Sequence, residues 1–203
     1  MASGTPISRI GDPPWEIATL FPNQGYWSEQ EYLALGANRR IEFADGQLEF
    51  PPMPTKTHQL IVGFLYRAIF GFVAGAGLGD VFLAGYRVKV LPGRFREPDV
   101  VVVLTRNTPA AHERFTESAD LVVEVVSEDD PARDLETKRT EYAQAGIPEY
   151  WIVDPRDRSI TVLTLPDGAQ EYTEAGRYTE GEEAASPLLA GLAVSVALTF
   201  DQE

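Results

Sequence analysis

The sequence predicts an α/β or α+β protein with a mixed central sheet, in one domain over residues 1–203. Several apolar runs are long enough for strands and too short for helices. One segment shows helical spacing of its apolar residues, and the 17 glycines and 15 prolines supply more turns than a helical bundle needs. A chain of 203 residues can bury a core as one domain without disulfide bonds.

The first third of the chain is expected to contain a loose arm, a short helix and a hairpin. Residues 1–14 are polar and rich in proline, which is typical of a loose terminal arm. The run Ser28-Glu29-Gln30-Glu31 is a capping box, so a helix is expected to continue through about residue 35. Asp45-Gly46 is a turn dipeptide and predicts a hairpin over residues 39–50.

The middle of the chain predicts the longest helix and three strands. Apolar residues recur at helical spacing from His58 to about Val73, so that helix should bury one face. Residues 82–90 alternate between apolar and polar side chains, as one half-buried strand does. Residues 98–104 and 120–127 are apolar runs that suit central strands covered on both faces.

The last part of the chain predicts one more helix and peripheral strands. A helix is expected over residues 134–145, because Gly146 follows as a stop signal. Strands are expected at residues 149–153 and 159–165, and residues 169–200 are expected to form further short strands.

Composition excludes several kinds of site. The chain has no cysteine and two histidines, which excludes disulfides, thiolate metal sites and a three-histidine zinc site. A metal would therefore be held mainly by oxygen atoms. The net charge of −14 argues against a generally nucleic-acid-seeking surface, although eleven of the 17 basic residues lie within residues 86–158. A cytoplasmic protein without a membrane span is expected, since no long apolar run or signal sequence is recognisable.

Two acidic residues interrupt the central apolar runs. Asp99 precedes a run of valines, and Glu124 lies inside Leu121-Val122-Val123-Glu124-Val125-Val126. A buried carboxylate needs a partner, a proton or a metal, whereas an exposed strand edge would need none of these. Two such acids on consecutive strands favour a site for a divalent cation that activates water or neutralises a phosphate.

A lysine that could serve this site lies on the following helix. Asp134, Lys138 and Tyr142 are spaced four residues apart and therefore share one helix face. The same spacing would also produce an ordinary solvated ion pair.

An ordered set of short motifs resembles the Uma-two family of restriction-endonuclease-like proteins, within the PD-(D/E)xK nuclease superfamily. The motifs span Glu42 to Pro155, a little over half of the chain. They are Ile41-Glu42-Phe43-Ala44-Asp45-Gly46, His58-Gln59-Leu60-Ile61-Val62-Gly63, Pro98-Asp99-Val100, Leu121-Val122-Val123-Glu124-Val125-Val126-Ser127, Arg133-Asp134 with Lys138 and Tyr142, and Ala145-Gly146-Ile147-Pro148-Glu149-Tyr150-Trp151-Ile152-Val153-Asp154-Pro155.

The resemblance implies a restriction-endonuclease-like fold that hydrolyses DNA with Mg²⁺ or Mn²⁺. Asp99, Glu124 and the Val125 carbonyl would hold the cation, and Glu42 would complete the acidic set. The superfamily's lysine usually follows the second acid by two residues, where this chain has a valine; the resemblance selects Lys138 instead. A homodimer is also implied.

Further residues have a functional and a structural interpretation. Around the metal site, His58 could meet a phosphate or cap its helix, Ser127 could support bound water or end its strand, and Tyr142 could position the lysine or pack. Six basic residues could contact the DNA backbone or form ordinary solvated surface. They are Arg87, Lys89, Arg94, Arg96, Arg133 and Arg139.

Three functions are therefore compatible with the sequence. The favoured one is a metal-dependent endodeoxyribonuclease, because a scaffold has no need to bury two carboxylates. A catalytically inactive nuclease-fold module for DNA or protein interaction is the alternative, and the acidic charge favours it. An enzyme acting on a small phosphoester would use the same acids and would differ in the shape of its pocket.

Overall fold

A six-stranded mixed sheet forms the centre of the computed structural model, which describes residues 22–36, 40–127 and 129–202. The strand order is β11-β10-β9-β8-β6-β3; β8 and β9 are parallel and the other neighbours antiparallel. The strands are β3 (Gly79–Leu83), β6 (Val100–Leu104), β8 (Leu121–Val125), β9 (Glu149–Asp154), β10 (Ser159–Thr164) and β11 (Thr173–Tyr178).

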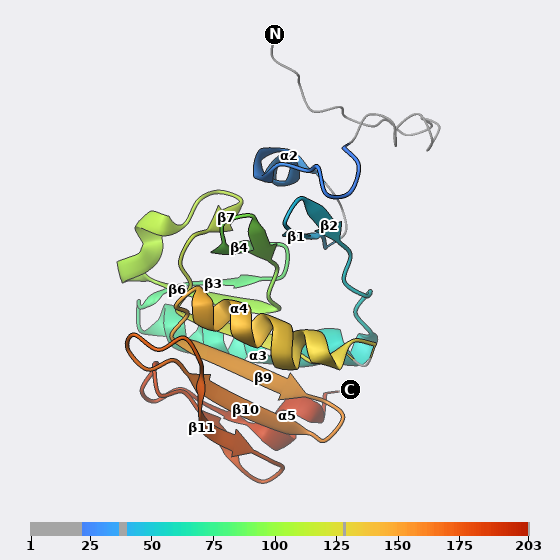
Figure 1. Ribbon diagram of the computed structural model, residues 1–203. Helices are drawn as coiled ribbons and strands as arrows, with labels where there is room; N and C mark the ends of the chain where they lie inside the picture. Colours follow the sequence, from blue (N-terminus) through green and yellow to red (C-terminus); the bar gives the residue numbers. More distant parts are fainter. Residues whose placement is uncertain (1–21, 37–39, 128, 203) are drawn as a thin grey trace.

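Helices cover both faces of this sheet, as the uninterrupted apolar runs predict. On one face, Val100 and Val102 of β6 belong to the same core cluster as Leu65 of α3 (Lys56–Gly75). On the other face, Val101 and Val103 share a cluster with Tyr142 of α4 (Lys138–Gln144). Successive strand residues therefore enter two separate cores. Both helices can be followed in Figure 1.

A second, five-stranded sheet lies toward one end of the molecule, with α2 (Glu29–Ala34) beside it (Figure 1). Its order is β2-β1-β5-β4-β7. Rings of Tyr32, Phe43 and Phe95 pack together between α2 and the sheet. The strands are β1 (Glu42–Ala44), β2 (Gln47–Glu49), β4 (Arg87–Leu91), β5 (Arg94–Arg96) and β7 (Phe115–Thr116).

The predicted start of α2 and the predicted hairpin are both confirmed. Ser28 and Glu31 make the two reciprocal hydrogen bonds of a capping box. Asp45 and Gly46 join β1 to β2 with φ angles of 49° and 81°, the left-handed conformation that a two-residue hairpin turn requires.

The single strand predicted over residues 82–90 is wrong. β3 ends at Leu83 and β4 begins at Arg87, and the two strands belong to different sheets. Gly85 lies between them with a φ of 102°, which a glycine adopts without strain. The alternation of side chains continues across this turn, so the sequence pattern does not reveal the change of sheet.

Two other expectations need correction. The helix predicted over residues 134–145 begins as a wide π turn, Arg133–Thr137, before α4. Residues 169–200 contain β11 and the β12–β13 pair, but end in a helix; the bounds are β12 (Glu183–Ala185), β13 (Ala193–Ser195) and α5 (Val196–Phe200). A 3₁₀ helix at Thr105–Ala110 is additional. The predicted arm at 1–14 lies outside the described residues.

Helix α3 is long and apolar enough to cross a membrane by length and composition, with a mean hydropathy of 1.3. It is the one helix in the described part of the chain that passes this test. Its residues Ile61, Leu65, Ile69 and Val73 are buried in the core against the central sheet. This packing accounts for the apolar composition of α3.

Candidate active site

Asp99 and Glu124 lie beside each other at the ends of neighbouring central strands. β6 and β8 pair with Val100 opposite Val123, and continuing that register brings Asp99 opposite Glu124. The backbone N–H of Val125 donates to Oδ2 of Asp99 over 2.8 Å, which ties the two strands together at this point. The two acids are 2% and 1% exposed, so the expectation of buried carboxylates holds.

Asp99 is held as an anion by two basic side chains. Nη1 of Arg40 lies 2.8 Å from its Oδ1, and Nε2 of His58 lies 3.2 Å from its Oδ2. Burial alone would raise the pKa of Asp99, but the hydrogen bond from His58 and the charge of Arg40 lower that pKa to about 2. Burial opposes the protonated form of His58, but the hydrogen bond to Asp99 and the negative charges of Asp99 and Glu124 together hold the histidine pKa above its ordinary value.

At Glu124, the nearby basic groups do not offset the effect of burial on the carboxylate, as they do at Asp99. Its Oε1 accepts a hydrogen bond from the Tyr142 hydroxyl at 2.6 Å and lies 2.9 Å from Nζ of Lys138. Burial, together with the negative charges of Asp134 and Asp99, outweighs the lysine and raises the pKa of Glu124 to about 7. Both donors contact Oε1, so Oε2 is the oxygen that these contacts leave for a cation.

Lys138 reaches the site from the first turn of α4. Its side chain is 5% exposed, and its Nζ lies 3.0 Å from Asp134 and 3.6 Å from Glu42 in addition to its contact with Glu124. These carboxylates hold the pKa of Lys138 above its ordinary value, although burial opposes them. Val126, at the position where the superfamily's lysine usually stands, is instead buried in the apolar cluster beneath α4.

Glu42 belongs mainly to a neighbouring network of ion pairs. It is fully buried, and its Oε2 lies 2.5 Å from Arg133 and 3.2 Å from Arg96. Burial would raise the pKa of Glu42, but Lys138 and the two arginines lower it. Glu42 therefore meets the candidate site through Lys138, rather than as a third acid beside Asp99.

A pocket of about 300 Å³ opens onto the two carboxylates. Its wall comes partly from the segment 51–54 and partly from the acidic pair Asp129 and Asp130. Ser127 lies in the wall, and its backbone N–H is 3.4 Å from Asp134. The residues at its floor and sides include Arg40, His58, Asp99, Glu124, Arg133 and Lys138.

The basic residues predicted to contact DNA are largely engaged within the protein. Arg96 is 3% exposed and contacts Glu141, Glu42 and Glu49, so its expected role on the DNA-binding surface is corrected to a structural one. Arg87 is 9% exposed; it contacts Glu97 and stacks over the ring of Tyr32. Burial and pairing leave these two guanidinium groups little access to a phosphate.

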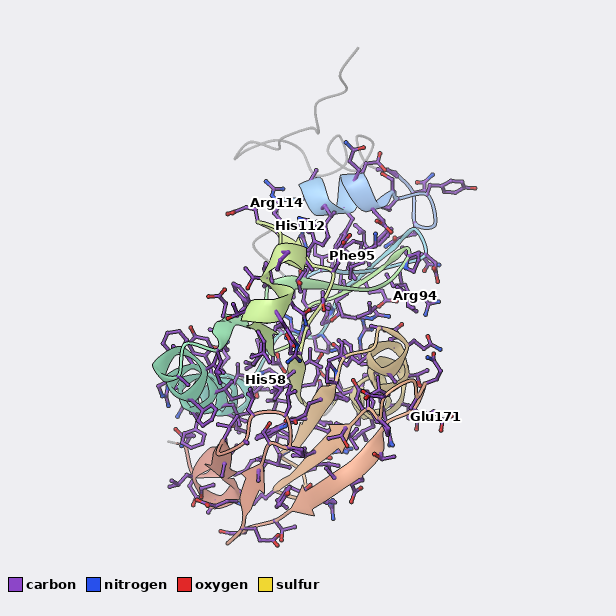
Figure 2. The ribbon with its side chains drawn as sticks, turned by 90° about the vertical axis from the view of Figure 1, so that its left-hand side faces the viewer. His58, Arg94, Phe95, His112, Arg114 and Glu171 are labelled. Atoms are coloured by element: carbon purple, nitrogen blue, oxygen red, sulfur yellow. The ribbon has the colours of Figure 1, made fainter. Side chains whose placement is uncertain are left out.

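The other four predicted contacts keep part of their side chains accessible. Lys89 lies 2.9 Å from Glu29, and Arg139 donates to the backbone carbonyl of Tyr172. Arg94 lies 2.6 Å from Asp45 and appears near the edge of the molecule in Figure 2. Arg133 lines the pocket while pairing with Glu42. Among the described residues, these six side chains therefore do not indicate a continuous basic surface for DNA.

Arg40 is the residue of this site that the sequence analysis missed. It lies two residues before β1 and reaches Asp99, which directly precedes β6 of the central sheet. A single basic residue in front of a hairpin gives no periodic signal, and its partner is distant in the sequence. The hairpin motif that begins at Ile41 is the sequence feature closest to Arg40, and it does not include this residue.

The donor set fits a hard divalent cation that takes part of its ligands from water or substrate. Among the described residues, no group of three or more His, Cys, Asp or Glu is arranged to hold a metal ion. Magnesium commonly binds through one or two carboxylates and completes its shell with water and phosphate oxygens. Burial and the charges of Asp134 and Asp99 raise the pKa of Glu124 in spite of Lys138, and a divalent cation would add positive charge that favours the ionised carboxylate.

The fold is that of a nuclease-like protein. The chain matches the crystal structure of a protein from Anabaena variabilis ATCC 29413, described as "a putative nuclease belonging to DUF820", with a TM-score of 0.69. The match covers 84% of this chain and 96% of that chain, at 20% sequence identity. The predicted mixed sheet flanked by helices is thereby confirmed.

The chain belongs to the Uma2 family. The family model, described as "Putative restriction endonuclease", matches residues 28–198 and so includes every motif quoted above. No curated protein matches the chain in sequence. Family membership and the nuclease-like fold together support a nuclease-like function, in a family whose members generally use divalent metal ions.

Proposed function

We propose that the protein is a Mg²⁺- or Mn²⁺-dependent endonuclease that hydrolyses DNA phosphodiester bonds. The observation that carries the proposal is the buried pair Asp99 and Glu124, which opens on a pocket with Lys138 2.9 Å from Glu124. Two carboxylates at the ends of adjacent strands, with a lysine in contact with one of them, form a constellation suited to phosphoryl-transfer chemistry.

Asp99, Glu124 and the Val125 carbonyl would hold the cation. When bound, a divalent cation polarises a phosphodiester and lowers the pKa of a coordinated water. Asp99 contributes a permanently ionised oxygen at neutral pH because of its pKa of about 2. Glu124 contributes a carboxyl that is about half ionised near neutrality and becomes fully ionised when positive charge is added beside it.

Lys138 and Tyr142 position Glu124 from the α4 side of the sheet. Both contact Oε1 of Glu124, which fixes the orientation of the carboxyl group. Lys138 stays protonated throughout the physiological range and supplies a fixed positive charge at the pocket wall. That charge offsets negative charge that develops on phosphorus during hydrolysis.

An acidic protein can bind DNA at such a site if local charges dominate. The net charge of −14 repels DNA at long range, but solvent screening limits this effect to about 8–10 Å. Arg40, His58, Arg133 and Lys138 line the pocket and provide local attraction. DNA binding is therefore expected to need both the divalent cation and these pocket residues.

The proposed assembly is a homodimer. The two strands of a duplex run in opposite directions, and a two-fold symmetric dimer presents one active site to each of them. Sedimentation of the protein with and without a DNA duplex tests this part of the proposal; a monomer under both conditions contradicts it.

A non-catalytic nuclease-fold module is the second candidate. One observation favours it: Nζ of Lys138 lies 2.9 Å from Glu124, 3.0 Å from Asp134 and 3.6 Å from Glu42, so its positive charge is already engaged by three carboxylates. Under this alternative, the ion pairs stabilise the fold and the chain binds DNA or protein without cleaving it.

A plasmid-nicking assay separates the two candidates. Supercoiled DNA is incubated with Mg²⁺, Mn²⁺ or EDTA, and with wild type, Asp99→Asn, Glu124→Gln and Lys138→Met. The proposal expects metal-dependent nicking that falls at least 100-fold in each variant. Glu149→Gln is the matched control, because Glu149 is equally buried on β9 but does not line the pocket. Nicking that survives in Asp99→Asn, or its absence from folded wild type with either metal, contradicts the proposal.

A further inference from the structure

Arg40 has an unusual position among the cations of the pocket. Its Nη1 contacts Oδ1 of Asp99 at 2.8 Å, and its Nη2 donates to the backbone carbonyl of Glu97. Its Nε is buried and has no hydrogen-bond partner among the described residues. The Arg40 side chain is 20% exposed and lines the pocket, so the guanidinium group is partly accessible from the side where a substrate would enter.

The other pocket cations are committed to several carboxylates. Lys138 contacts three of them, and Arg133 contacts Glu42 and Glu49. Within the described part of the chain, Arg40 contacts a single carboxylate, and that carboxylate is Asp99, one of the two proposed metal ligands. A divalent cation bound by Asp99 would therefore take over the neutralisation that Arg40 provides.

We propose that Arg40 is a phosphate-binding residue that exchanges its contact with Asp99 for an anionic oxygen of the substrate phosphodiester when a divalent cation binds. This inference rests on the proposed nuclease function and adds a substrate-binding residue to it. The exchange keeps the charges balanced at each stage. The guanidinium neutralises Asp99 first, and then the phosphate once Asp99 is shared with the cation.

The geometry of the arginine suits both roles. A guanidinium group binds carboxylate and phosphate oxygens with the same planar arrangement of donors. The unpaired Nε offers a donor that neither Asp99 nor Glu97 occupies. The contact of Nη2 with the Glu97 carbonyl anchors one side of the group and leaves the Asp99 side free to exchange.

The exchange predicts opposite effects on two binding reactions. Arg40 competes with the cation for Asp99, so its removal should tighten metal binding in the absence of DNA. It also binds phosphate, so its removal should weaken DNA binding in the presence of metal. A residue that only stabilises the folded site would weaken both reactions or neither.

The first measurement is Mn²⁺ binding by calorimetry without DNA, using wild type, Arg40→Gln and Arg133→Gln. Arg40→Gln is expected to lower the Mn²⁺ dissociation constant about 10-fold, because a positive charge beside a ligand carboxylate is removed. Arg133→Gln removes the same charge from the same pocket but from carboxylates that are not proposed ligands. It should change the constant about 2-fold or less.

The second measurement is the affinity for a fluorescently labelled DNA duplex in Ca²⁺, followed by anisotropy. Arg40→Gln is expected to weaken binding about 10-fold. Arg40→Lys retains the charge but lacks the planar fork, so it should keep Mn²⁺ affinity near the wild-type value and bind DNA with intermediate strength. If Arg40→Gln is unfolded by circular dichroism, Arg40→Lys still tests the exchange: equal DNA affinity to wild type contradicts it.

The outcomes distinguish this inference from the proposed function. Mn²⁺ affinity that is unchanged or lower in Arg40→Gln overturns the role of Arg40, while the metal site itself stands. DNA affinity that is unchanged in Arg40→Gln overturns it as well. No Mn²⁺ binding by wild type or by either variant overturns the proposed function, and the inference with it.

Discussion

Nζ of Lys138 lies 2.9 Å from Oε1 of Glu124, although the two residues come from different elements on either side of the π turn at Arg133–Thr137. The lysine thus approaches the acid from the helix that covers the sheet. The strand position next to the acid on the same face, Val126, packs under that helix instead. With the lysine on α4 and a valine on the strand, the protein has both the buried Lys138–Glu124 ion pair and apolar packing beneath the helix.

The first prediction concerns the pH dependence of stability. The pKa of Glu124 is about 7 in the folded protein and about 4.5 when the chain unfolds, so folding favours its protonated form. Its contribution to stability is full below about pH 4.5 and is lost as the pH rises through 7. The pKa of Asp99 is lowered by folding, so the contribution of Asp99 to stability depends on pH in the opposite direction. That contribution is lost only as the pH falls toward 2. Between pH 5 and 8.5, the change in stability that these two carboxylates cause therefore comes mainly from Glu124.

Glu124→Gln should remove that dependence, because glutamine stays neutral. In EDTA, the wild type is expected to lose on the order of 2 kcal/mol between pH 5 and 8.5 relative to the variant. Urea titrations of both proteins at these two pH values give the comparison. Parallel stability changes in wild type and variant would show that Glu124 is already ionised at neutral pH.

The second prediction concerns the buried lysine. Lys138→Met removes the shared partner of Glu124, Asp134 and Glu42 and keeps a side chain of similar length. Breaking a buried ion pair from one side typically costs about 3–5 kcal/mol, so the variant should be destabilised by that amount in urea titrations at pH 8.

A double variant checks that the loss comes from the charge pair. Adding Glu124→Gln to Lys138→Met should restore part of the stability, since one of the uncompensated carboxylates is then absent. If the two substitutions are additive, the 2.9 Å contact does not contribute a coupling energy.

The two carboxylates could be predicted because a charge inside an apolar strand violates a local pattern. Asp99 and Glu124 stand out for this reason, and Lys138 follows from helical spacing and from the family resemblance. Arg40 could not be predicted in this way. Its partner is fixed by the contact between two sheets, and no period in the sequence connects residues so far apart.

The basic residues illustrate the same limit. Arg94 and Arg96 look equivalent in the sequence, since both alternate with Phe95 on one short strand. Arg96 is buried among three carboxylates because Glu42, Glu49 and Glu141 arrive there from the hairpin and from α4. The sequence alone therefore predicts the same role for both arginines. The tertiary structure shows that Arg96 is buried and that Arg94 is partly exposed.

The third prediction follows from this difference. Arg96→Ala should destabilise the protein by about 3–5 kcal/mol, because it removes the buried guanidinium group that Glu141 and Glu42 share. Arg94→Ala is the matched comparison two strand positions away. Its side chain is 36% exposed and pairs with the exposed Asp45 and with Glu141, which keeps Arg96 as its other partner, so the cost should be about 1 kcal/mol or less. Equal midpoints for the two variants in urea would contradict the structural role of Arg96.

The fourth prediction concerns stabilisation by metal. A ligand that binds only the folded protein stabilises it by about 2.7 kcal/mol at 100 times its dissociation constant. For a chain of this size, that corresponds to an increase of about 5–10 °C in the melting temperature. Mn²⁺ should produce this shift in wild type at pH 8, where Glu124 is mostly ionised, and a smaller one at pH 6, where protons compete for its carboxyl.

Variants assign that shift to the two carboxylates. Asp99→Asn and Glu124→Gln should melt at the same temperature with and without Mn²⁺, whatever their own stability. Glu149→Gln should lower the melting temperature, because Glu149 accepts buried hydrogen bonds from Trp151 and Leu188, yet it should retain the full Mn²⁺ shift. A shift that persists in both Asp99→Asn and Glu124→Gln would place the bound cation elsewhere on the protein. A shift lost in all three variants would mean that it reports general destabilisation rather than a site.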